Sequence, residues 1–88
     1  MFRMYDAKRC DVELIVANGL MDAMVDRFGP DVTTYACDQE NFRVVVTVSL
    51  GSPFYNWIFG FGGLVKIKSP AEVREEYKRR VEEAMNGL

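Results

Sequence analysis

The sequence predicts a single α+β domain in which helices pack on a four-stranded antiparallel sheet. Four segments read as strands, and in most of them apolar residues recur with a period of two. Three further segments repeat apolar residues at helical spacing. The chain has 88 residues, of which 49% are hydrophobic, and this is enough for one domain with a modest core.

The first strand and the first helix are predicted in the N-terminal third. Residues 11–17 predict a strand, with Val12, Leu14 and Val16 on one face and Glu13 and Ile15 on the other. Asn18 is expected to cap a helix over residues 18–28, which Gly29 and Pro30 end. The apolar stripe of this helix consists of Leu20, Met21, Met24, Val25 and Phe28.

A hairpin is predicted next. Residues 32–37 form a weakly apolar strand, residues 38–41 a polar loop, and residues 42–50 the longest strand. Val45 lies on the face opposite to the main apolar row, and a strand that is apolar on both faces belongs in the middle of a sheet. The main row consists of Phe42, Val44, Val46, Val48 and Leu50.

The last third combines two helix starts with a short strand. Ser52 is expected to cap a short aromatic helix with Pro53 in its first turn, and the glycines after it end the helix. Residues 64–68 predict a strand. Ser69 and Glu72 predict a capping box for a final helix over residues 70–85.

The predicted element order is therefore β-α-β-β-α-β with an additional C-terminal helix. This is the ferredoxin-like arrangement. Right-handed crossovers place the first and third strands side by side in the centre of the sheet.

Composition argues against several kinds of function. The chain has no histidine, which removes the usual general base and the commonest metal ligand. Cys10 and Cys37 are too few for a zinc site and are expected to be reduced thiols, although pairing between them stays open. We therefore expect no catalytic residues, no metal and no cofactor. With no long apolar run and no signal peptide, the expected location is cytoplasmic.

Two regions are candidate contact surfaces. On the aromatic helix, Tyr55 and Phe59 are expected to fall away from the main stripe and to mark a protein contact. Core packing is expected for Phe28, Val46, Trp57 and Phe61. The glycines of the segment GFGG follow a helix and precede a strand, so they do not predict a phosphate-binding loop.

The second region is the sheet face that two helices cannot cover. It is expected to present Glu13, Ile15, Thr33, Tyr35, Arg43, Val45, Thr47, Lys66 and Lys68. Three interpretations are open: a face that is solvated or covered by the last helix, a dimer or interdomain surface, and a surface for an anionic ligand. We take Tyr35, Arg43, Val45, Lys66 and Lys68 as its candidate contacts.

Several motifs resemble the C-terminal extension domain of WYL-domain transcriptional regulators, the WCX domain. They are VELIV, MDAMVDRFG, FRVVVTVS, FYNWIFGFGGLVKI and SPAEVREEYKRRVEEA, which together extend over residues 11–84. The lead-in over residues 2–6 also resembles the connector that follows the WYL domain in these proteins. The resemblance implies an interdomain linker over residues 1–10 and a regulatory domain over residues 11–88.

The resemblance further implies a fragment of a larger bacterial regulator. The family associates this domain with dimer formation and with transmitting an effector response, so the implied partners are a second copy, the WYL domain of the same polypeptide, or both. A nucleic acid or nucleotide is a candidate effector of the full-length protein, whereas sequence-specific DNA binding by this fragment is not expected. The alternatives are a small-molecule- or nucleotide-binding module of the same fold and a small acylphosphatase-like enzyme, because topology does not decide function.

Overall fold

The computed structural model describes residues 8–88, so the expected connector over residues 2–6 lies outside the described part. The first strand, β1, runs from Arg9 to Ala17. It begins two residues before the expected domain start at residue 11, so Arg9 and Cys10 belong to the sheet and not to a linker.

The elements follow in the predicted order along the chain. In sequence they are β1 (Arg9–Ala17), the 3-10 turn η1 (Asn18–Leu20), α1 (Met21–Phe28), β2 (Thr33–Ala36), β3 (Asn41–Ser49), α2 (Ser52–Phe59), the 3-10 turn η2 (Gly62–Leu64), β4 (Val65–Ser69) and α3 (Ala71–Asn86). Strand and helix ends differ from the predictions by a few residues, most at α1, whose first three predicted residues form η1.

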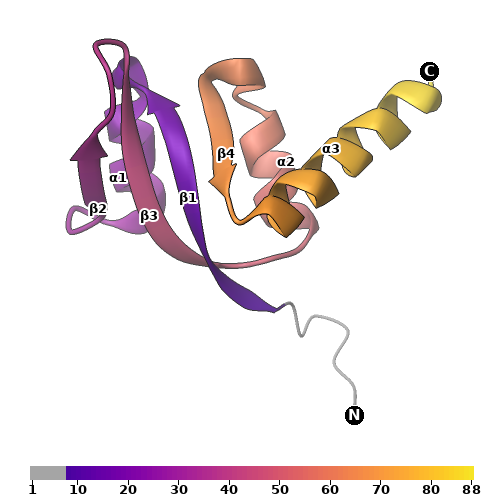
Figure 1. Ribbon diagram of the computed structural model, residues 1–88, viewed down its shortest axis with the longest axis horizontal. Helices are drawn as coiled ribbons and strands as arrows, with labels where there is room; N and C mark the ends of the chain where they lie inside the picture. The colour runs from indigo at the N-terminus through magenta and orange to yellow at the C-terminus, as the bar shows by residue number, and fades with distance from the viewer. Residues whose placement is uncertain (1–7) are drawn as a thin grey trace.

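The four strands form one antiparallel sheet in the order β2-β3-β1-β4. This confirms that the first and third strands are central. They pair over their whole length, from Arg9 opposite Ser49 to Ala17 opposite Asn41. Figure 1 shows α1 behind the sheet, and α3 leaving the end of β4 with its C-terminal turns directed away from the sheet.

One face of the sheet carries the core. Leu14, Val16 and Val44 are fully buried on the central strands, and Met24 of α1 and Ile58 of α2 are buried against them. Because side chains alternate across a strand, the residues between these positions lie on the other face. Val46 belongs to the core row but is only half-buried, as are Phe28, Trp57 and Phe61, all of which pack against the core.

The three predicted N-caps were wrong, since none of the helices has a side-chain cap hydrogen bond. Each polar side chain makes a contact distant in sequence instead. Asn18 Nδ2 donates to the carbonyl oxygen of Gln39, at 2.9 Å. Ser52 Oγ accepts from Arg80, and Ser69 Oγ donates to Glu13 Oε1 at 3.1 Å. These side chains therefore join elements to one another rather than satisfying a helix terminus.

The predicted stop of α1 is confirmed. Gly29 has φ 96° and its N–H donates to the carbonyl oxygen of Val25 at 2.7 Å. A positive φ of this kind favours glycine, because other residues place Cβ against the backbone there. In the hairpin, Asp38 Oδ1 accepts the N–H groups of Glu40 and Asn41, at 2.8 and 2.9 Å. These bonds lower the pKa of Asp38 and hold the turn into β3.

Candidate interaction surfaces

The open face of the sheet presents the nine residues that the sequence assigned to it. None of the nine is buried, and the strand register places them in cross-strand rows. Tyr35 lies opposite Arg43, Arg43 opposite Ile15, and Ile15 opposite Lys66. In the neighbouring row Val45 lies between Thr33 and Glu13. We call these nine residues, Glu13, Ile15, Thr33, Tyr35, Arg43, Val45, Thr47, Lys66 and Lys68, the open face.

A charge network crosses the middle of the open face. Arg43 forms an ion pair with Glu13, whose side chain is 19% exposed, and the Arg43 guanidinium lies 4.6 Å from the ring centroid of Tyr35. The hydrogen bond from Arg43, followed by that from Ser69, lowers the pKa of Glu13 against the opposing effect of desolvation. Glu13 is therefore ionised at neutral pH and balances the charge of Arg43, which leaves Lys66 and Lys68 as the basic flank.

The last helix does not cover the open face. Val73 of α3 is buried in the core, which lies on the opposite side of the sheet. Tyr77 of α3 stacks on Tyr55 of α2, with ring centroids 6.3 Å apart and planes within 13°. Helix α3 therefore packs against α2 through this stack, and it also contacts the edge strand β4. Coverage of the open face by the last helix is therefore wrong, and none of the helices within residues 8–88 lies over this face.

Tyr55 is not at the surface, which corrects the expectation for the aromatic helix. It is only 5% exposed, because α3 packs on the flank of α2 that the sequence left unassigned. Besides Tyr77, it contacts Phe54 edge-to-face at 5.2 Å, and the Arg80 guanidinium lies 4.5 Å from its ring centroid. Burial raises the pKa of the Tyr55 hydroxyl.

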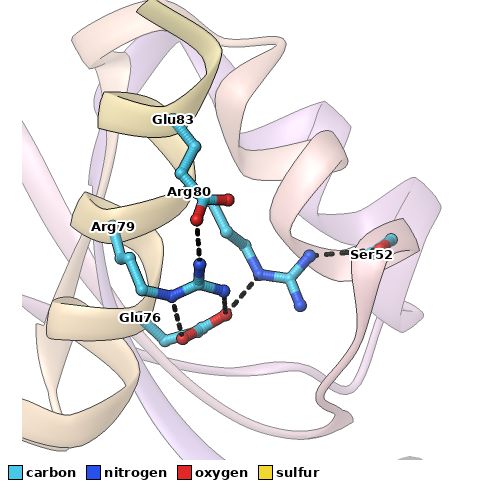
Figure 2. A network of polar contacts seen from close by, with 5 residues as sticks. All are labelled: Ser52, Glu76, Arg79, Arg80 and Glu83. Carbon is cyan, nitrogen blue, oxygen red and sulfur yellow. Dashed lines mark hydrogen bonds and ion pairs between the residues drawn. The ribbon is translucent and has the colours of Figure 1, made fainter. Parts of the chain in front are cut away.

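An ionic network on α3 reaches α2 through a hydrogen bond from Arg80 to Ser52 (Figure 2). Glu76 accepts hydrogen bonds from Arg79 at 2.7 and 3.0 Å and from Arg80 at 2.7 Å. Arg80 also donates to Ser52 Oγ at 3.1 Å, and Arg79 donates to Glu83 at 2.6 Å. The two guanidinium groups lower the pKa of Glu76 to about 2. The spacing of the charged residues along the sequence predicts the ion pairs within α3. It does not predict the hydrogen bond from Arg80 to Ser52, which depends on how α3 packs beside α2.

Phe59 is exposed as expected, with 57% of its surface accessible. It borders a groove of about 220 Å³ between α2 and α3, whose lining also includes Tyr77, Val81 and Ala84. Its role in a contact stays a prediction. On the other flank of α2, Trp57 packs edge-to-face on Phe28 and Phe61, with centroids 5.4 and 5.1 Å apart.

The two cysteines are free and lie far apart in the sheet. Cys10 is opposite Val48, whereas Cys37 follows Ala36, which is opposite Phe42. Along β3, Val48 and Phe42 are six residues apart, or roughly 20 Å at the rise of a strand, whereas a disulfide needs Cα atoms within about 7 Å. Pairing within one chain is therefore excluded in this fold.

Residues 8–88 contain no group of side chains suited to hold a metal ion. Within the same part of the chain, no helix has both the length and the apolar character needed to cross a membrane.

Comparison with known families supports a regulatory role. The family described as the WCX domain matches residues 8–85, nearly the whole chain. This match is consistent with a regulatory domain of WYL-type regulators. No curated protein matches the chain.

Proposed function

The chain belongs to the WCX domain family, and we propose that it is a non-enzymatic regulatory and dimerisation domain of a WYL-type transcriptional regulator. In this proposal it transmits effector binding to a DNA-binding domain outside this chain. Its partner is a second copy of the domain, the WYL domain of the same polypeptide, or both. The regulator acts in the bacterial cytoplasm.

The observation that carries the proposal is the open face itself. Ile15, Val45 and Tyr35 are apolar positions on a side of the sheet that no helix of the described chain covers, and the ion pair of Arg43 and Glu13 lies among them. Arg43, with its charge balanced by Glu13, can approach a partner surface at a lower desolvation cost than an unpaired charge. An uncovered face that combines apolar side chains with a charge that is already paired is suited to a protein contact.

The size of the face sets the expected affinity. Four strands spaced about 4.8 Å apart span roughly 14 Å across the sheet. Along β3, the open-face residues extend from Arg43 to Thr47, or roughly 16 Å. The resulting footprint is well below the about 800 Å² per partner of a stable interface. We therefore expect weak self-association of the isolated domain, reinforced in the regulator by the neighbouring domains.

The proposed mechanism is a population shift. If an effector binds one arrangement of the WCX and WYL domains more tightly than another, it shifts the equilibrium toward that arrangement. The coupling free energy is limited to the difference between the two affinities. Helices α2 and α3 are joined by the Tyr55–Tyr77 stack and by the hydrogen bond from Arg80 to Ser52, and these contacts support movement of the domain as one body.

Sedimentation equilibrium of the chain at concentrations up to about 1 mM tests the proposal. We expect a monomer–dimer equilibrium that Val45→Lys weakens, because it would replace an apolar contact by one additional positive charge from each copy. The matched control is Arg74→Glu on the exposed side of α3, which should leave the equilibrium unchanged.

A strictly monomeric chain at 1 mM would contradict the homodimer, and a dimer that Val45→Lys does not affect would contradict the open face as its contact. In the second case the contact would lie elsewhere, and Phe59→Ala would then test the groove between α2 and α3.

The nucleotide-binding alternative rests on Lys66 and Lys68, both of which are exposed. It has weaker support, because Arg43, the third cation of the face, is already paired with Glu13. A thermal-shift screen with nucleotides and short single-stranded DNA distinguishes the two functions. Stabilisation that Lys66→Glu abolishes would favour the nucleotide-binding role.

A further inference from the structure

Strand β3 extends beyond its neighbour β2. The last paired residues are Thr33 of β2 and Val45 of β3, whereas β3 continues to Ser49. Before Thr33 the chain turns toward α1, and the N–H of Val32 donates to the carbonyl oxygen of Gly29 at 3.2 Å. Within residues 8–88, the part of the β3 edge after Val45 therefore has no strand beside it on that side.

The main-chain groups at this edge point outward. The N–H of Leu50 donates to the carbonyl oxygen of Lys8 at 2.8 Å, and Val48 lies opposite Cys10 in the same register. In an antiparallel pair, successive residues direct their N–H and C=O groups alternately to the two sides of the strand. Thr47 and Ser49 therefore direct theirs away from β1, along the line where β2 would continue.

A cavity of about 590 Å³ borders this edge. The edge residues Thr47 and Ser49 line it, and Phe28, Val48 and Phe54 supply apolar side chains from α1, β3 and α2. Its volume is within the range of about 300–1,000 Å³ that is usual for ligand sites. An exposed sheet edge beside an apolar cavity is the arrangement that takes up an extended peptide as an added strand.

The lining of this cavity is positively charged. It includes Arg9 and Arg27 but no aspartate or glutamate, although acidic residues outnumber basic ones in the chain, by 13 to 11. Arg9 Nη1 donates to Ser49 Oγ at 3.5 Å, and the Arg27 guanidinium lies 5.4 Å from the ring centroid of Trp57. Neither arginine forms an ion pair with a carboxylate within the described residues. The N-terminus of α2, at the same cavity, adds partial positive charge.

We propose that an extended acidic segment of a partner polypeptide binds here as a short added strand. Its main chain pairs with Thr47 and Ser49, in line with β2, and its carboxylates meet Arg9 and Arg27. The edge N–H and C=O groups favour a peptide over a small anion, because a small anion would leave the outward C=O groups unpaired. The site goes beyond the proposed function, since it lies at a sheet edge and needs neither a dimer nor an effector.

The test uses the 88-residue chain and a capped six-residue peptide of alternating valine and glutamate. We expect saturable binding below 1 mM by nuclear magnetic resonance titration, with the amide N–H groups of Thr47 and Ser49 becoming protected from hydrogen exchange. The corresponding peptide of valine and lysine should not bind. Inorganic phosphate should neither compete with the acidic peptide for binding nor protect the amides of Thr47 and Ser49 from exchange.

Three variants test the assigned contacts. Arg9→Ala and Arg27→Ala should each weaken binding by about threefold, as expected for one exposed ion pair, and Arg74→Ala on α3 should have no effect. Thr47→Pro removes an outward N–H without removing a hydrogen bond to β1 and should reduce binding further. If Thr47→Pro fails to fold, amide protection in the unmodified chain decides the question.

The proposal is overturned if the acidic peptide does not bind at 1 mM, or if it binds without protecting Thr47 and Ser49. It is equally overturned if phosphate or the lysine peptide binds as well as the acidic peptide. The two proposals fail separately. If the chain is monomeric in sedimentation, but the acidic peptide protects the amides of Thr47 and Ser49, the homodimer is contradicted and this site is supported.

Discussion

Replacing Tyr55 and Phe59 separately by alanine tests the packing of α3 on α2. The two aromatics lie one helical turn apart on the same short helix, but Tyr55 is 5% exposed and Phe59 57% exposed. Truncating a buried aromatic typically costs about 3–5 kcal/mol. The stacking on Tyr77 and the position of Arg80 over the ring add specific contacts, so we expect a loss of about 4 kcal/mol for Tyr55→Ala. For Phe59→Ala we expect a loss of about 0.5 kcal/mol or less.

Urea denaturation followed by far-ultraviolet circular dichroism measures both changes. An 88-residue domain has a total stability of roughly 4–13 kcal/mol, so Tyr55→Ala should move the midpoint by a large fraction of its value or unfold the chain. Tyr55→Leu keeps apolar volume, and its loss should be intermediate. Equal small losses for Tyr55→Ala and Phe59→Ala would refute the packing of α3 on α2.

Three further predictions concern the ionic network around Glu76, the two cysteines and the turn after α1. Because the pKa of Glu76 falls from 4.5 to about 2 on folding, its contribution to stability is complete above pH 4.5 and is lost as pH falls toward 2. In Glu76→Gln, the free energy of unfolding should therefore vary less with pH in that window. An unchanged slope between pH 4.5 and 2 would contradict the assignment. Cys37 is exposed and Cys10 half-buried, so Cys37 should react first with a thiol reagent, and mild oxidation of dilute protein should form no intrachain disulfide by mass spectrometry. Gly29→Ala should destabilise by about 1–3 kcal/mol because φ is 96°, whereas Gly19→Ala, at a position with open space and no positive φ, should be tolerated in thermal unfolding.

Patterns in the sequence were sufficient for the central strands. Val12, Leu14 and Val16 recur with a period of two, and a one-residue slip of that strand would turn this row away from the core. The same reasoning placed Val45 and Arg43 on the open face, where the structure has them. These predictions succeeded because a strand has only two faces and one of them must be buried.

Local signals at the helix starts were less reliable. Ser52 and Ser69 have the spacing of N-caps, but their hydroxyls contact Arg80 and Glu13 from distant parts of the chain. A serine hydroxyl contributes a similar free energy to a cap and to a contact between elements. Which of the two it makes depends on what the fold brings near, and a local motif holds no information about that.

Amphipathic periodicity and element order thus determined the sheet, its central strands and its uncovered side, because burial of one apolar face admits a single arrangement. Tertiary packing alone decided the path of α3, the burial of Tyr55 beneath it, and the short reach of β2 that leaves Thr47 and Ser49 at an open edge. Those features depend on contacts between segments distant in sequence, whose partners become neighbours only once the chain is folded.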